Sequence, residues 1–269
     1  MKKELLIVSL LAVFLIGFGS GLFTGNSLAA AKLQNLEQEN SGQNSGFLPE
    51  NVLEPLDQAR LDETINIVAV NSEGRGIIST GEVEIVPGKG RVLFNTNPFV
   101  EPDTQNSLET AKRVAEKYTG KSLAEKDVIY SVQNSGAELI GGPSAGAAFT
   151  VATIAAIQGL KIREDSAITG TIEENGLIGE IGGVAEKLQA AGESGKKLFV
   201  IPKGQSIVTY YERQVTQEQR GFLTITRSKI VPKTLDLVEF AKQWDLEVKE
   251  AQTIYDAVEF LTEDSQGKE

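Results

Sequence analysis

The sequence predicts a mixed α/β (α+β) fold in a single compact domain. Short runs rich in β-branched residues, bounded by glycine and proline, alternate along the chain with stretches whose apolar residues have helical spacing. Hairpin signals occur among them, so strands and helices are mixed. The 269 residues are enough for one sizeable core, and no internal repeat is visible.

The N-terminal segment 1–31 is expected to lie outside this fold. Two lysines precede an apolar run at 5–23, and no charged residue occurs over 5–31. About 20 apolar residues span a bilayer as a helix, although the alanines at 29–31 also offer a signal-peptidase site. The length of the run favours an uncleaved, single-pass anchor over a cleaved signal that would give a secreted protein. The lysines mark the cytoplasmic side, which places the rest of the chain outside the cytoplasm.

A polar stretch rich in Asn, Gln and Glu at 32–63 is typical of a linker, so the folded domain is expected over 64–264. Strands are predicted at 65–70, 77–94, 127–132, 197–202 and 246–251, the second of them broken by the turn at Pro87-Gly88. Residues 166–183 predict a hairpin, because Asn175-Gly176 suits a type I′ turn.

The helix predicted at 106–118 carries its own boundary signals. Asn106 can act as N-cap, Glu109 completes a capping box, and Gly120 can act as C-cap. Further helices are predicted from Ser144 to about Gly159, from about Val184, at 235–244 and at 253–262.

The composition removes several kinds of site. The net charge is −11, and no basic stripe with interleaved aromatic residues occurs, which argues against a nucleic-acid partner. The chain contains no cysteine and no histidine. Disulfides, iron–sulfur clusters and thiolate zinc sites are therefore excluded, and the commonest general base is missing. No metal and no other cofactor is predicted.

One stretch superficially resembles a nucleotide-binding loop. Gly120-Lys121-Ser122 would need a glycine five residues earlier to form a P-loop, and that position is Ala115 within the predicted helix. We interpret these residues as a helix end, so the sequence predicts no ATPase site in this chain.

A serine between glycines, in Gly142-Pro143-Ser144-Ala145-Gly146, precedes an alanine-rich helical run. Gly-x-Ser-x-Gly is also the elbow motif of α/β-hydrolases, but their mechanism needs a histidine. Two interpretations stay open at this point. The serine merely caps the helix, or it is a nucleophile placed beside the free N–H groups and the positive end of the helix dipole.

If Ser144 is a nucleophile, its proton must pass to a lysine or a carboxylate. Lys187 shares a helix face with the apolar residues Val184 and Ala191. Burial would lower the pKa of its amine toward a range in which it accepts a proton at neutral pH. The alternative is that the side chain runs along the helix to solvent, and periodicity alone leaves both interpretations open.

Three segments occur in the order "GGPSAGAAF", "ITGTI" and "GEIGGVAEKLQAAGESGKKLFVIP". Together they resemble the proteolytic domain of the Lon proteases, over about residues 64–262. The resemblance implies a compact α/β peptidase domain that cleaves proteins or peptides and assembles with copies of itself, commonly in rings. It also implies a dyad of Ser144 and Lys187, supported by the residues around the serine and by Thr169, which could hydrogen-bond Lys187.

The sequence departs from the family pattern in three respects. No ATPase module accompanies the domain in this chain, which leaves a separate ATPase partner open. Gly141 stands where many members have an acidic residue, and the segment 205–233 has no counterpart. The rival interpretation is a non-proteolytic Lon-like binding or scaffold module tethered to the membrane. The presence of both Ser144 and Lys187 argues against it.

Overall fold

The computed structural model describes residues 54–56, 60–95, 99–133 and 139–263. The chain divides into two units, Met1–Ser45 and Gly46–Glu269, and all described residues belong to the second. The expected anchor at 1–31 and most of the expected linker lie outside the described residues. No helix in the described ranges is long and apolar enough to cross a membrane.

A seven-stranded mixed sheet forms the centre of the described unit, in the order β16-β13-β10-β2-β3-β7-β4. Its strands are β2 (Leu61–Val70), β3 (Gly76–Pro87), β4 (Val92–Asn95), β7 (Lys126–Gln133), β10 (Ser166–Ile168), β13 (Leu198–Pro202) and β16 (Glu247–Ala251). β2, β10, β13 and β16 run parallel, and β3 is antiparallel to both of its neighbours. The carboxyl ends of four strands therefore meet at one edge of the sheet.

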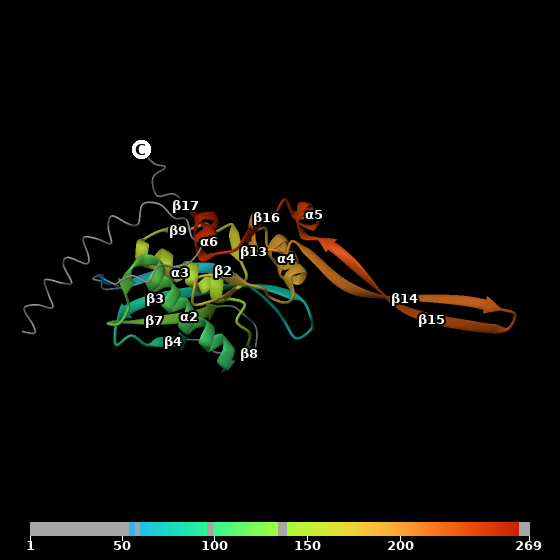
Figure 1. Ribbon diagram of the computed structural model, residues 1–269, viewed down its shortest axis with the longest axis horizontal. Coiled ribbons are helices and arrows are strands. Elements are labelled where there is room, and N and C mark those ends of the chain that lie inside the picture. The colour runs from blue at the N-terminus through green and yellow to red at the C-terminus, as the bar shows by residue number, and fades with distance from the viewer. Residues whose placement is uncertain (1–53, 57–59, 96–98, 134–138, 264–269) are drawn as a thin grey trace, which may run out of the picture. The chain divides into compact units, whose positions relative to one another are not determined.

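Five α-helices occur in the described residues and cover both faces of this sheet (Figure 1). They are α2 (Pro102–Thr119), α3 (Gly146–Gln158), α4 (Val184–Glu193), α5 (Leu237–Ala241) and α6 (Ile254–Leu261), and a short 3₁₀ helix (Lys242–Trp244) follows α5. One apolar cluster joins α2, α3 and α6 to the sheet, and a second joins α4 and α5 to it. In β13 the two clusters take alternate residues, as expected for a strand buried on both faces.

The predicted helix at 106–118 starts earlier than its capping signals suggested. α2 begins at Pro102 with Glu101 as N-cap, so the predicted capping box of Asn106 and Glu109 is wrong. Proline favours the first helical position, because its φ is already helical and its missing N–H has no partner there. The predicted end is confirmed, since Gly120 has a φ of 67° and donates its N–H to a carbonyl of the last turn.

The predicted hairpin at 166–183 is right only in its second part. β10 joins the central sheet, and the hairpin consists of β11 (Thr171–Ile172) and β12 (Ile178–Gly179). The type I′ turn is wrong, because Asp245 is the only non-glycine with positive φ among the described residues. Instead the Gly176 N–H donates to the Glu173 carbonyl, and Gly176 itself takes the left-handed conformation. This geometry fits a type I turn followed by a glycine bulge.

The segment 205–233, which has no counterpart in the family pattern, forms most of a long hairpin. β14 (Ile207–Arg220) and β15 (Leu223–Asp236) pair antiparallel over 14 residues each (Figure 1). Most of its side chains are exposed. The remaining short strands are β1 (Glu54–Pro55), β5 (Phe99–Val100), β6 (Lys121–Ser122), β8 (Leu139–Ile140), β9 (Lys161–Ile162) and β17 (Thr262–Glu263).

Candidate active site

The predicted site residues gather where β10 ends. Thr169 is the first residue after this strand and is fully buried. α3 packs on one face of the sheet and α4 on the other, and the segments at their N-terminal ends meet at this edge. Open parallel sheets bind their ligands outside the carboxyl ends of their strands. The topology therefore brings the serine segment and the lysine helix to the place where a ligand site is expected.

Ser144 lies in a tight turn before α3 rather than at its cap. The N-cap of α3 is Ala145, which makes no side-chain capping bond. The Gly146 N–H donates to the Pro143 carbonyl at 3.0 Å and closes the turn around Ser144. The half-buried Ser144 hydroxyl makes no hydrogen bond to any other described residue. The interpretation of Ser144 as a capping residue is therefore wrong.

Both glycines of the predicted motif have a structural reason. Gly142 has a φ of 83°, in the left-handed region that L side chains rarely adopt. Gly146 lies against α2, where an added Cβ would be only 2.4 Å from the hydroxyl oxygen of Ser107. A side chain at either position would therefore displace the turn that carries Ser144.

Lys187 points into the protein. Its side chain is buried, with the residue only 4% exposed, and its Nζ donates a hydrogen bond of 3.3 Å to Oγ1 of Thr169. Burial lowers the pKa of Lys187 from 10.5 to about 8, and the neighbouring charge of Glu186 acts in the opposite direction. The alternative in which the lysine runs along α4 to solvent is wrong.

Thr169 lies between the serine segment and the lysine. Its hydroxyl accepts from Lys187 and donates to the Ser144 carbonyl, at 3.3 Å in each case. The Gly170 N–H donates to the same carbonyl at 2.9 Å. Among the described residues, no hydrogen bond joins the Ser144 hydroxyl directly to the Lys187 amine. The residues that follow β10 therefore hold both the backbone of Ser144 and the amine of Lys187.

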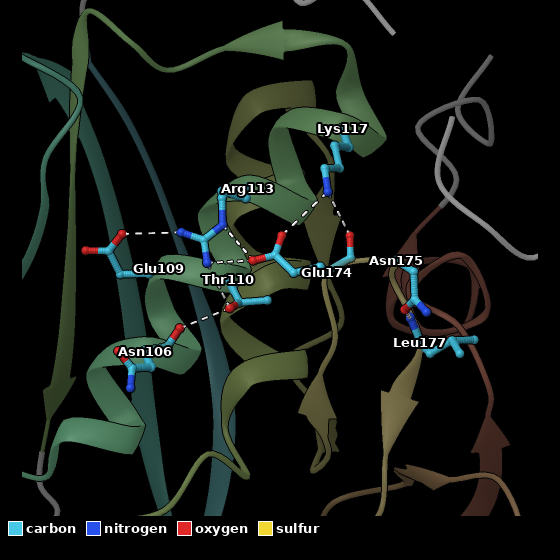
Figure 2. A network of polar contacts seen from close by, with 8 residues as sticks. All are labelled: Asn106, Glu109, Thr110, Arg113, Lys117, Glu174, Asn175 and Leu177. Atoms are coloured by element: carbon cyan, nitrogen blue, oxygen red, sulfur yellow. Dashed lines mark hydrogen bonds and ion pairs between the residues drawn. The ribbon is translucent and has the colours of Figure 1, made fainter. Parts of the chain in front are cut away.

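A polar network on α2, which the sequence did not reveal, holds the segment that follows Thr169. Figure 2 shows Arg113 and Lys117 reaching Glu174 in the turn between β11 and β12. The Arg113 guanidinium lies 2.6 Å from the Glu174 carboxylate, and Lys117 Nζ donates to the Glu174 carbonyl at 3.0 Å. These residues are about sixty positions apart, so only the i, i+4 spacing within α2 was visible in the sequence.

The glycine at 141, noted as a departure from the family pattern, also has a physical reason. A Cβ added there would lie 2.3 Å from Oε2 of Glu101, the N-cap residue of α2. The space that a side chain at 141 would fill is therefore occupied by a carboxylate from another element. Sequence reasoning missed Glu101, because nothing in its surroundings links it to a residue forty positions away.

A serine in a tight turn before a buried helix and a desolvated lysine thus lie near the carboxyl end of one parallel strand. This arrangement defines the class of protein as a mixed α/β domain with a candidate serine–lysine site. The chain belongs to the family of the Lon protease (S16) C-terminal proteolytic domain, whose model matches residues 63–236. This match confirms the family resemblance.

Three relatives illustrate the similarity. The chain is 30% identical over 144 residues to the archaeal Lon protease of Archaeoglobus fulgidus, which covers 52% of this chain and 22% of that protein. It is 34% identical over 134 residues to the Lon protease of Escherichia coli, covering 49% and 17%. It is 36% identical over 144 residues to the Lon protease of Acinetobacter baumannii, covering 52% and 17%. These alignments span about a fifth of the length of the curated relatives.

Proposed function

We propose that this protein is a serine endopeptidase that cleaves protein or peptide substrates, with Ser144 as nucleophile and Lys187 as general base. The observation that carries the proposal is the buried Lys187 amine, which is held by Thr169 beside the segment of Ser144. An amine with a pKa of about 8 is partly neutral at physiological pH and can accept a proton. A dyad of this kind needs no histidine.

In the proposed reaction, Ser144 Oγ attacks the scissile carbonyl while Lys187 accepts its proton. Lys187 then returns the proton to the leaving amine, which departs and leaves an ester on Ser144. A water molecule hydrolyses this ester with the same lysine as base. Thr169 keeps the amine in place because its hydroxyl oxygen accepts a hydrogen bond from the amine.

The oxyanion of the tetrahedral intermediate needs hydrogen-bond donors near Ser144. The backbone N–H groups of Ser144 and Ala145 suit this role, because neither is bonded to an acceptor in the described part of the chain. They lie at the start of α3, where the helix dipole also favours negative charge. We assign these two groups as the oxyanion donors of the proposed peptidase.

The proposal includes cleavage of peptides without ATP. Gly120-Lys121-Ser122 lies at the end of α2 and in β6, and Ala115 is buried inside the helix. These residues therefore form no P-loop. Addition of Mg-ATP to the purified protein is expected to leave the rate of peptide cleavage unchanged.

Cleavage of casein and of a fluorogenic peptide by wild type and Ser144→Ala tests the proposal. We expect Ser144→Ala to lose at least ~10³-fold in kcat/KM, as is typical for a covalent nucleophile, with no change in melting temperature. Ser194→Ala is a matched control, because Ser194 is exposed at the end of α4. A serine-directed fluorophosphonate should label the control but not Ser144→Ala. Near wild-type turnover by folded Ser144→Ala would contradict the mechanism, and an inactive wild type would favour a binding module.

A further inference from the structure

Two hydroxyl groups of α2 hold the turn that carries Ser144. Thr104 Oγ1 donates to the Gly142 carbonyl at 3.1 Å, and Ser107 Oγ donates to the Pro143 carbonyl at 3.2 Å. Both α2 residues are buried, although the side chains are polar. Because residues three apart share a helix face, this face of α2 binds two successive carbonyl groups of the turn.

These bonds fix the direction of a neighbouring N–H group. A trans peptide unit is planar, and its C=O and N–H point in opposite directions. The Pro143 carbonyl shares its plane with the N–H of Ser144, so a carbonyl held toward Ser107 directs that N–H away from α2. The Gly146 N–H donates to the same carbonyl but belongs to the turn itself. The Ser107 hydroxyl is therefore the contact that ties this peptide plane to the body of the domain.

The position of the Ser107 hydroxyl is itself restricted. It lies so close to Gly146 that an added Cβ there would be 2.4 Å away, and the residue is buried. Thr104 restrains the preceding peptide unit in the same way through the Gly142 carbonyl. Water has little access to replace either hydroxyl, so the orientation of both peptide units depends on these side chains.

We propose that Ser107 and Thr104 are positioning residues, whose hydroxyls orient the Ser144 N–H toward the oxyanion. The inference rests on the proposed function, since it assigns a role within that same site. Oxyanion donors act through their fixed orientation before the reaction begins. A turn freed from α2 still carries the nucleophile, and the base keeps its place on α4, but the Ser144 N–H group no longer points in one direction. The loss should therefore fall on the transition state and not on substrate binding.

The test compares Ser107→Ala and Thr104→Val with wild type on one fluorogenic peptide. Removal of a whole oxyanion donor costs about 10²–10³-fold in kcat, so we expect a loss of about tenfold or more from misorientation, with KM changed by less than about twofold. A peptide boronate, which forms a tetrahedral adduct on the serine, should lose affinity by the same factor. The same peptide with a carboxylate in place of the boronate should bind to the variants and to wild type with equal affinity.

Two further variants separate positioning from general stability. Thr104→Ser keeps the hydroxyl and should restore kcat. Thr110→Val removes a hydroxyl of the same helix that donates to the Asn106 carbonyl at 3.1 Å and accepts from Arg113 at 3.2 Å. This hydroxyl makes no bond to the turn of Ser144, so the variant should leave kcat unchanged (Figure 2). The acid limb of the pH profile, which reports Lys187, should not move in any of these variants.

The inference would be overturned if Ser107→Ala and Thr104→Val kept the wild-type kcat and boronate affinity while Ser144→Ala was inactive. An equal loss in Thr110→Val, or a loss that follows the melting temperature through all variants, would also overturn it by showing a structural role. An active Ser144→Ala protein is a different result, because it removes the proposed function itself.

Discussion

Around the candidate active site, α2, α3 and α4 turn polar side chains inward, whereas the β14–β15 hairpin turns apolar side chains outward. Lys187 and Thr104 are buried and hydrogen-bonded, while Tyr211 is 73% and Phe222 98% exposed. Cross-strand backbone pairing and surface ion pairs such as Lys233–Glu212, at 3.0 Å, hold the hairpin together. The two regions differ in how much of their geometry depends on each side chain.

The two regions should respond differently to substitution. In the site region the buried side-chain hydroxyls and the Lys187 amine each have a protein partner, so the loss of one group releases another that water cannot easily reach. Among the described side chains of the hairpin, Val208 and Leu235 near its base pack on the cluster of α4 and α5, and most of the others are exposed to solvent. The same substitution should therefore have a large effect in the first region and a small effect in the second.

The largest expected effect is the loss of the base. Lys187→Arg should reduce kcat/KM at least ~10³-fold, because a guanidinium stays protonated and cannot accept the proton of Ser144. Lys229→Arg on the hairpin makes the same chemical change at an exposed lysine and should leave the rate unchanged. Steady-state cleavage of one peptide by both variants, with circular dichroism as a check of folding, measures the contrast. Appreciable cleavage by Lys187→Arg would refute the assignment of the base.

The next contrast concerns stability and uses one substitution at two phenylalanines. Phe149 of α3 is 1% exposed and packs edge-on against Tyr130, whereas Phe222 is 98% exposed. Phe149→Ala should lower the free energy of unfolding by about 3–5 kcal/mol through lost burial and a residual cavity. Phe222→Ala should change it by less than about 0.5 kcal/mol. Urea denaturation measures both changes in the free energy of unfolding, and equal losses in the two variants would contradict the expected difference between the regions.

The same contrast explains which elements the sequence predicted. α4 starts at Val184 as predicted, and α2 and α3 end at Gly120 and Gly159 as predicted. These boundaries depend on local capping and on one buried face, which periodicity records. The start of α2 was missed although Pro102 marks it, because Asn106 and Glu109 offered a competing capping signal. The bonds from Thr104 and Ser107 to the turn of Ser144 also hold the first turns, and they leave no local pattern.

The hairpin was missed for the opposite reason. A strand acquires its alternating pattern when one face is buried, and most side chains of β14 and β15 have no buried face. The site itself was only partly readable. Helical spacing offered the burial of Lys187 as one of two interpretations, and its approach to Ser144 through Thr169 depends on how β10 inserts between β2 and β13. Only the family resemblance linked these residues before the fold was known.

Removal of the buried amine should raise stability in a pH-dependent way. The pKa of Lys187 is about 8 in the folded protein and 10.5 ordinarily, so between these values the unfolded chain binds a proton that the folded chain has lost. Wild-type stability should therefore rise with pH over this window. The difference between the two pKa values corresponds to a loss of about 3 kcal/mol in folding stability. The wild type bears this whole loss below pH 8. Lys187→Met should be more stable by up to about that amount at pH 7.

The stability gain should shrink above pH 8 and become small near pH 10.5, above which the wild-type amine is neutral in both states. Lys229→Met on the hairpin serves as the control and should show no such pH dependence, because its side chain is exposed. Urea denaturation of the three proteins between pH 7 and pH 10.5 measures these differences. A constant difference between Lys187→Met and wild type over this range would show that the amine is not held neutral by the fold.

The smallest expected effect concerns Glu186, which is exposed on α4 beside the base. Its charge raises the pKa of Lys187 against the larger effect of burial, so Glu186→Gln should lower that pKa. The acid limb of kcat/KM should then move to lower pH, since the amine becomes neutral earlier. The shift should be less than about one pH unit, because exposed charges are screened by water and salt. High salt should move the acid limb of the wild-type profile in the same direction.

Glu212→Gln removes the same charge from the hairpin, far along the chain from the base, and should leave the acid limb in place. If Glu212→Gln moved the acid limb as much as Glu186→Gln does, the net charge of the protein would set the pH dependence, and not the charges near Lys187. The two regions would then not differ in their effect on the base.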